Sequence, residues 1–298
     1  MRILVGIMHC MENEFPACLS ALARQTHRDH ERFVVENLPN KEAHDTLYRT
    51  FMSRSEEFSL FVKLDADMVL IRDDFFEMVA RRFASDAPLA FLAVGVHDFF
   101  TDRMIDSLNI FRNTVTWRLG DERVFVDRTH SAPVVYDHDT LAPAAWHCPN
   151  PSPFQAFHFG VHKATKVMQI GKPEKNSRAS REHWKNLEDL RKNFAAKNDR
   201  RLGLALLGAE IAFRCRWSYE EVDFNSPATE NAFREVERLT SAQIGEILRR
   251  GSPLSLSFLP PAMRQEALSR IRNRRALSFE NAGVWKYLAR TLFRKVVP

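Results

Sequence analysis

Short apolar runs alternate with amphipathic segments over the first third of the chain. The run 3–8 is continuously apolar, which is typical of a strand buried on both faces of a sheet. Between such runs, apolar residues recur every three to four positions, which predicts helices. The expected strands are 3–8, 32–36, 60–64 and 89–96, and the expected helices are 13–25, 42–53 and 73–83. This alternation predicts an α/β fold with a doubly wound, mostly parallel sheet.

The pattern changes after residue 96. Short strands are expected at 108–116, 123–126 and 132–136, and a proline-rich loop precedes a last strand of the sheet at 154–160. From residue 173 onward the periodicity is helical, with helices expected at 181–197, 203–217, 228–239, 241–249, 261–274 and 282–297. We therefore expect a sheet-containing domain over 1–172 and a helical C-terminal extension over 173–298.

Composition and charge limit the classes of protein that fit. The chain has 298 residues, of which 45% are hydrophobic and 27% charged, and this excludes a wholly disordered or fibrous protein. A net charge of +5 permits anionic partners without requiring one. Four cysteines without a CxxC pair argue against a disulfide framework. Because no apolar run is long enough to cross a bilayer and the N-terminus has the pattern of a strand, we expect a cytoplasmic protein.

Two carboxylates follow the third expected strand. Asp65 and Asp67 are two positions apart, so an extended backbone would point both side chains the same way. Open α/β sheets bind ligands at the carboxyl ends of their strands. Like charges side by side repel unless a cation lies between them, and carboxylate oxygens suit Mg²⁺ or Mn²⁺. The pair predicts a divalent-cation site, and the competing interpretation is a helix cap or a solvated loop.

Four features occur in a fixed order over residues 1–95. They are the strand 3–8, the phrase Leu19-Ser20-Ala21-Leu22-Ala23-Arg24-Gln25-Thr26, the strand ending at Glu36, and Asp65-Ala66-Asp67 about thirty residues later. In this order they resemble GT-A glycosyltransferases of the family 2 type. The resemblance implies a GT-A-type fold, a nucleotide-sugar donor (a UDP-sugar first), and Mn²⁺ or Mg²⁺ on Asp65 and Asp67. It also implies that Glu36 contacts the donor's base or ribose, and that the acceptor is a glycan or is lipid-linked.

A second segment of this type lies downstream. Phe157-His158-Phe159-Gly160-Val161-His162-Lys163 resembles the His-Gly-Lys segment near the end of many GT-A catalytic domains. The resemblance implies that a histidine completes the metal shell and that Lys163 contacts the donor diphosphate. The spacing leaves both His158 and His162 as candidate ligands, with His158 nearer to the family pattern. Gly160 would let the backbone approach the ligand closely.

The catalytic base has no clear position in the sequence. An inverting transferase needs a carboxylate to take the proton of the acceptor hydroxyl, whereas a retaining one does not. The candidate bases are Asp98, Asp127, Asp137 and Asp139, of which Asp98 and Asp139 are the first choices. Each of them also fits a turn residue. Three histidines lie near these acids and either line an acceptor pocket or form a polar loop: His130, His138 and His147.

Two other functions stay open from the sequence. Residues 65–69 also fit the first motif of haloacid-dehalogenase-like phosphatases, in which Asp65 would be the nucleophile, although that motif usually lies on the first strand. A non-catalytic nucleotide-sugar-binding module would share the fold.

The expected helix 282–297 carries an apolar stripe and several basic residues. It either lies on an anionic membrane surface, at the inner face of the membrane, or packs on the protein. No motif that reads nucleic acid accompanies the basic residues, so we expect no nucleic-acid partner.

Overall fold

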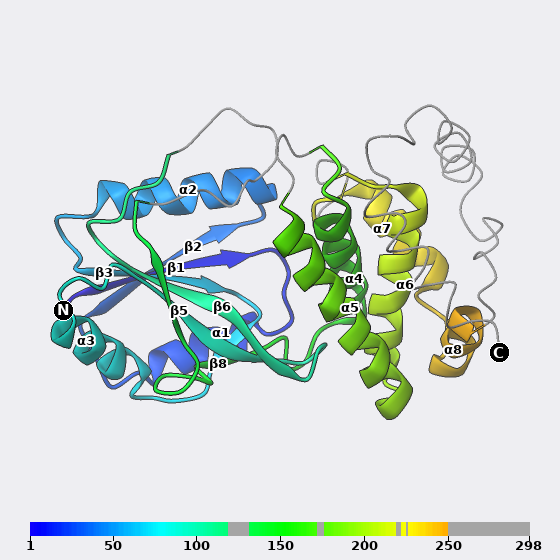
Figure 1. The fold of residues 1–298 in the computed structure, drawn as a ribbon, viewed down its shortest axis with the longest axis horizontal. Coiled ribbons are helices and arrows are strands. Elements are labelled where there is room, and N and C mark those ends of the chain that lie inside the picture. Colours follow the sequence, from blue (N-terminus) through cyan, green and yellow to red (C-terminus); the bar gives the residue numbers. More distant parts are fainter. Residues whose placement is uncertain (119–130, 172–175, 219–221, 225, 250–298) are drawn as a thin grey trace.

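A sheet with helices on both faces forms one half of the molecule, and a group of helices stands at one end of it (Figure 1). The computed structural model describes residues 1–118, 131–171, 176–218, 222–224 and 226–249. Within these ranges, the chain first builds the sheet and then the helical group, so the two halves are also successive in sequence.

The eight strands of the sheet come from residues 3–147. In chain order they are β1 (Ile3–His9), β2 (His30–Glu36), β3 (Leu60–Asp65), β4 (Met68–Leu70), β5 (Phe91–Asp98), β6 (Arg103–Arg112), β7 (Val134–Asp137) and β8 (Ala145–His147). The order across the sheet is β2-β1-β3-β6-β5-β8-β4, and β7 pairs with β5. Because β1 is parallel to both β2 and β3, their carboxyl ends open at the same edge.

Antiparallel pairing enters the sheet with β6. This strand turns back after β5 and lies between β3 and β5, antiparallel to both. β4 is antiparallel to β8, whereas β7 and β8 are parallel to β5. The expected α/β class is therefore confirmed, but the sheet is more mixed than expected. Among the described strands, four pairings are parallel and three are antiparallel.

Helices cover both faces of the sheet. α1 (Phe15–Ala23) and α3 (Phe75–Ser85) lie on one face, and α2 (Asn40–Ser53) lies on the other (Figure 1). Successive side chains of a strand point to opposite faces, and β1 shows the consequence. Ile3 and Val5 belong to the apolar cluster that includes Phe76 of α3, whereas Leu4 belongs to the cluster that includes Phe51 of α2.

Five helices make up the group at the carboxyl end of the sheet. They are α4 (Pro153–Met168), α5 (Ser177–Lys197), α6 (Arg200–Cys215), α7 (Pro227–Val236) and α8 (Ser241–Arg249). They share an apolar cluster that reaches the sheet half through Phe100, whose ring stacks on Phe159 of α4 at 3.8 Å. The expected helices of this region are confirmed as far as the structure describes them.

The last expected strand of the sheet, at 154–160, is wrong, because these residues belong to α4. Ser152 caps the helix by accepting from the Gln155 amide, and Gln155 completes the capping box. Gly160 does not approach a ligand but the neighbouring helix, since a Cβ there would lie 1.7 Å from the carbonyl oxygen of Ala205 in α6. Gly208 of α6 makes the reciprocal close approach to Phe157. Two glycines therefore let α4 and α6 pack backbone to backbone.

Three expected elements, 123–126, 261–274 and 282–297, lie outside the described residues, and the apolar stripe of 282–297 lies there with them. Among the helices that the structure describes, none is both long and apolar enough to cross a membrane.

Candidate functional site

A cleft of about 420 Å³ opens where the carboxyl ends of β1 and β3 face α4. That volume lies within the range of roughly 300–1,000 Å³ that small-molecule sites occupy. One side, which we term the sheet wall, presents Glu12, Asp65, Asp67, His147 and Cys148. The other, the helix wall, presents His158, His162, Lys163 and Lys166 of α4. The cleft therefore has acidic and basic sides that face each other.

Strand pairing brings Asp67 and Cys148 together across 81 residues of sequence. The antiparallel register of β4 and β8 places Met68 opposite His147. The next residues outward are Asp67 and Cys148, and the Cys148 amide donates to the Asp67 carbonyl at 2.8 Å. The Cys148 thiol then donates to Oδ2 of Asp67 at 3.0 Å.

An unusual backbone angle turns two adjacent side chains toward Asp67. In a regular strand, His147 and Cys148 would point to opposite faces. Cys148 has a φ of 51°, in the left-handed region that residues other than glycine adopt infrequently. Here Nε2 of His147 lies 3.4 Å from Oδ2 of Asp67 and 3.8 Å from Sγ of Cys148. Strained backbone of this kind is concentrated at functional sites.

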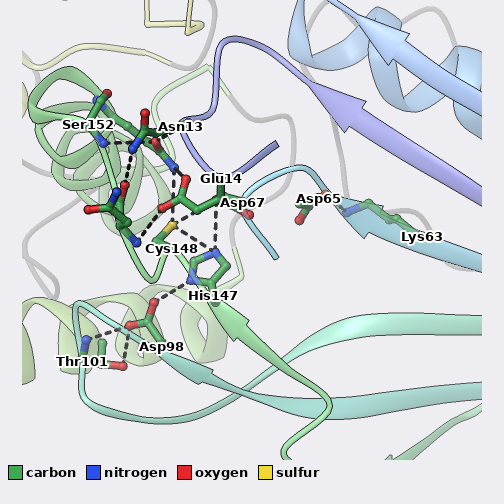
Figure 2. A network of polar contacts seen from close by, with 12 residues as sticks. Asn13, Glu14, Lys63, Asp65, Asp67, Asp98, Thr101, His147, Cys148 and Ser152 are labelled. Carbon is green, nitrogen blue, oxygen red and sulfur yellow. Dashed lines mark hydrogen bonds and ion pairs between the residues drawn. The ribbon is translucent and has the colours of Figure 1, made fainter. Parts of the chain in front are cut away.

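Asp98 orients the His147 ring from behind. The parallel register of β5 and β8 sets these two residues side by side, and Nδ1 of His147 donates to Oδ1 of Asp98 at 2.6 Å. The other carboxylate oxygen accepts from the amide and hydroxyl of Thr101 (Figure 2). Burial disfavours the charged carboxylate, but the hydrogen bond and charge of His147 outweigh it and lower the pKa of Asp98. Burial likewise opposes the imidazolium, yet Asp67 and Asp98 raise the pKa of His147 to about 9.

The second oxygen of Asp67 has no partner. Oδ1 is buried and makes no hydrogen bond. A buried carboxylate oxygen without a donor is costly, so Oδ1 is available to a ligand. Ligand atoms of Asp67, His147 and Cys148 all lie within 4.8 Å of one another. These three residues can hold a metal ion.

The two carboxylates of the Asp-Ala-Asp sequence face different partners. Oδ1 of Asp65 accepts from Nζ of Lys63 at 2.8 Å, which makes Lys63 its ion-pair partner. Asp67 instead faces His147 and Cys148, and Figure 2 shows Asp65 well to one side of that cluster. The expectation that both side chains point the same way is wrong, because β3 ends at Asp65 and the chain turns before Asp67.

Two further acids come from the loop between β1 and α1. Glu12 lines the cleft, and its pKa is raised to about 8 by burial and by the charge of Asp67. Glu14 is buried and has a structural role, since it accepts from the Gln155 side chain at 2.9 Å and from the Asn150 amide at 2.9 Å. Glu14 thereby ties the β1–α1 loop to the start of α4.

The helix wall holds basic groups that are largely shielded from solvent. Burial and the charge of Lys166 lower the pKa of Lys163 to about 8, and its Nζ lies 4.8 Å from the centre of the Phe159 ring. Burial also lowers the pKa of His158 and, together with the nearby lysines, that of His162. Each of these groups would gain from an anion in the cleft.

The two histidines that the sequence offered as metal ligands lie on this wall. Nε2 of His158 is 3.2 Å from the carbonyl of Val222. In the part of the chain that the structure describes, neither His158 nor His162 joins a metal-holding group with Asp65 or Asp67. Instead, His147 lies beside Asp67, where the sequence predicted His158 or His162 as the histidine ligand.

The remaining candidates lie outside the cleft or behind it. Glu36 ends β2 with a side chain that is 56% exposed, 3.7 Å from Nδ1 of His9. Asp139 is exposed in the loop after β7, and Asp137 accepts from the amides of Thr140 and Leu141 in the same loop. His138 lies 3.4 Å from Asp106. Asp127 and His130 lie outside the described residues.

Cys148, His147 and Asp98 occur in the order of a nucleophilic triad, but the thiol is not activated. A nucleophilic cysteine needs a positive environment that favours the thiolate. Cys148 is instead buried against the Asp67 carboxylate, and both effects raise its pKa well above the usual value. The geometry therefore favours metal ligation over covalent catalysis.

The sequence alone gave no role to Cys148 or Glu12. It offered Asp98 only as a candidate base and not as the partner of His147. The histidine itself was noted only as one of three in a polar segment. The signal that could have marked it is the sequence Trp146-His147-Cys148-Pro149, where two potential ligands end a short strand just before a helix cap.

Comparisons with known proteins leave the family open. No protein-family model matches the chain, and no curated protein sequence matches it either. Among solved structures, the chain is similar to the crystal structure of A197 from STIV, with 15% sequence identity and a TM-score of 0.30. The similarity covers 38% of this chain and 65% of that one, slightly under two thirds of its length. A likeness of this size carries no argument about fold or activity.

Proposed function

We propose that the protein is a GT-A-type glycosyltransferase that moves a sugar from a nucleotide-sugar donor with the help of a divalent cation. The observation that supports this best is the polarity of the cleft. A cation-binding group stands on the sheet wall, and partly desolvated cations stand on the helix wall. A diphosphate coordinated to a cation would satisfy both walls at once.

The residues fit the cation that such a reaction uses. Asp67 and His147 would hold it, because Nε2 of His147 lies 3.4 Å from Oδ2 of Asp67 and the other oxygen of Asp67 has no hydrogen-bond partner. A bound divalent cation supplies charge that stabilises the diphosphate leaving group. Asp98 positions His147, and Lys163 would place a second positive charge on the diphosphate from the opposite wall.

The donor's base would occupy the end of the cleft beside α2. That end is lined by apolar and aromatic residues, which suits a flat ring: Val35, Leu38, Ala43, His44 and Tyr48. We propose a UDP-sugar as donor and a glycan or a lipid-linked sugar as acceptor. Placement in the cytoplasm, peripheral to the inner face of the membrane, is part of the same proposal.

Glu12 is the best-placed general base if the transfer inverts the sugar. Asp98 is occupied by His147 and Thr101, and Asp139 is exposed outside the cleft. Glu12 lines the cleft and has a pKa raised to about 8. A cation beside Asp67 would lower that pKa toward neutrality, where a carboxylate takes a proton most effectively.

Binding of a nucleoside diphosphate tests the proposal directly. Calorimetry with UDP, GDP and CDP, each with and without a divalent cation, should show cation-dependent binding of one of them. Bound donor should also stabilise the fold by about 2.7 kcal/mol at a hundredfold excess over Kd. Lys163→Met should weaken binding at least tenfold, whereas Lys192→Met, which removes an exposed lysine on α5, should not. Binding that ignores both the cation and Lys163 would contradict the proposal.

No observation in the described residues favours the other two functions. A phosphatase with Asp65 as nucleophile would need this carboxylate available, and Lys63 engages its Oδ1. A non-catalytic module would bind the same donor, so only a transfer assay separates it from the enzyme. Release of free nucleoside diphosphate from the donor, dependent on acceptor, would exclude the module.

A further inference from the structure

We propose that the cation site is a zinc-type site in which Cys148 is the third protein ligand, beside Asp67 and His147. The carboxylate pair Asp65 and Asp67 predicted a hard, all-oxygen site for Mn²⁺ or Mg²⁺. The structure instead divides that pair and brings a thiol and an imidazole to Asp67. The three donor atoms are one oxygen, one nitrogen and one sulfur.

The spacing of the donor atoms fits tetrahedral zinc. Zinc–oxygen and zinc–nitrogen bonds are about 2.1 Å and zinc–sulfur bonds about 2.3 Å, so neighbouring ligands of a tetrahedral ion lie roughly 3.4–3.6 Å apart. In the structure Asp67 Oδ2 is 3.4 Å from His147 Nε2 and 3.0 Å from Cys148 Sγ. Nε2 and Sγ are 3.8 Å apart. Shifts of about 0.6 Å or less would seat the ion.

His147 is held in the tautomer that binds a metal. A distance of 2.6 Å to the Asp98 carboxylate places a proton on Nδ1, which leaves the lone pair of Nε2 for the ion when the ring is neutral. A carboxylate behind a ligating histidine is the usual support of zinc sites. Thr101 in turn fixes Asp98 with two hydrogen bonds.

The unpaired oxygen of Asp67 is a second, independent indication. Oδ1 is buried without a donor, although the other oxygen receives the Cys148 thiol. An ion would displace the thiol proton to solvent, and a carboxylate bound to it through both oxygens would leave neither oxygen without a partner. The charges of Asp67 and of the Cys148 thiolate would then balance those of the ion.

The chemistry of the three ligand atoms also indicates which ion binds best. Thiolate and imidazole favour Zn²⁺, whereas Mg²⁺ requires six oxygen ligands in an octahedron. Three protein ligands leave a fourth position that faces the cleft, as in catalytic rather than structural zinc sites. Occupation of that position by a diphosphate oxygen rests on the proposed function, but the three protein ligands do not.

Cobalt substitution tests the thiolate ligand. Metal-free protein titrated with Co²⁺ should develop a sulfur-to-cobalt charge-transfer band, and Zn²⁺ should abolish it by displacing the cobalt. Cys148→Ser should lose the band and weaken Zn²⁺ binding at least tenfold, while changing Mn²⁺ binding little. Asp67→Asn should weaken the binding of both ions.

Two matched thiol variants assign the band. Cys10 also lines the cleft and Cys215 is buried in α6, so Cys10→Ser and Cys215→Ser should both keep it. X-ray absorption of the zinc-loaded wild type needs no variant and should show one sulfur at about 2.3 Å. Absence of that sulfur, or a cobalt band that survives Cys148→Ser, would overturn the site.

The two proposals fail separately. A zinc site without any nucleoside diphosphate binding would refute the glycosyltransferase and leave the metal site standing. Nucleoside diphosphate binding with Mn²⁺ but no cobalt band would refute the zinc site and leave the glycosyltransferase proposal standing.

Discussion

The two walls of the cleft reach their charge in opposite ways. On the sheet wall and directly behind it, residues from four separate segments meet, and several charged groups have a partner within the protein: Asp98 pairs with His147, Asp65 with Lys63, and Glu14 with Gln155. On the helix wall, the basic groups belong to one helix, and burial lowers the pKa of each of His158, His162 and Lys163. The sheet wall is assembled by pairing, whereas the helix wall is held in place by packing against α6.

Because of this difference, the two walls give different evidence about the site: one indicates the charge of the ligand, and the other indicates its position. At neutral pH a buried lysine whose pKa is depressed destabilises the fold unless an anion offsets its charge, so Lys163 on the helix wall indicates that the ligand is anionic. A hydrogen-bond network in which one atom lacks a partner indicates where a ligand binds. On the sheet wall that atom is Oδ1 of Asp67. The predictions below perturb one wall at a time.

The largest effect should come from removing the support of the helix wall. In Gly160→Ala, the new methyl group would lie 1.7 Å from a backbone oxygen of α6, which cannot rotate away. We expect a loss of about 3 kcal/mol in unfolding free energy, measured by urea denaturation. Gly245→Ala on α8 is the control, because its nearest neighbour would lie 4.0 Å away, and it should be neutral or slightly stabilising. Equal effects of the two variants would show that α4 and α6 are not closely packed.

Glu12 on the sheet wall should control the rate of transfer. Glu12→Gln removes the proposed base and should slow sugar transfer about 100-fold, with nucleoside diphosphate affinity unchanged. Steady-state kinetics and calorimetry on the same preparation measure the two quantities. Glu56→Gln is the matched control, since that side chain is exposed in the turn after α2 and does not line the cleft. If Glu56→Gln lowers the rate as much as Glu12→Gln does, Glu12 is not the base.

Asp98 and Asp139 were equivalent candidates in the sequence, and the structure gives them different roles. Asp98→Asn should weaken metal binding by about 10–100-fold, because the ring of His147 loses its carboxylate support. Asp139→Asn should leave metal affinity unchanged, since its side chain is exposed in a loop. Competition against a chromophoric chelator measures both affinities, and a reversed order would refute the role of Asp98.

Lys163 should show the clearest pH dependence. Its folded pKa of about 8 lies below the usual 10.5, so the unfolded chain binds more protons between these values. Lys163→Met should therefore stabilise the protein at pH 7 by at most about 3 kcal/mol, and the gain should vanish as pH rises toward 10.5. Denaturation at several pH values measures it. A variant that is less stable at pH 7 would show that the lysine is favourably paired in the fold.

Local pattern was sufficient for most elements of the sheet half. The runs at 3–8 and 60–64 and the helices between them follow from apolar periodicity, because burial on one or both faces acts on each segment separately. The strand predicted at 154–160 was wrong because local pattern alone does not separate the two kinds of element there. Its apolar residues fit a strand or a buried helix, and the Ser152–Gln155 cap together with the Gly160–Gly208 contact decided for the helix.

By itself, the sequence determined the α/β class of fold and pointed to Asp67, just after a buried strand, and to Lys163 as candidate site residues. Only the tertiary structure decided what surrounds Asp67. His147 and Cys148 reach it through the register of β4 with β8, and Asp98 reaches His147 through the register of β8 with β5. Strand register depends on the packing of the whole sheet and not on the local sequence. A site built by register across 81 residues therefore has no signature in sequence spacing.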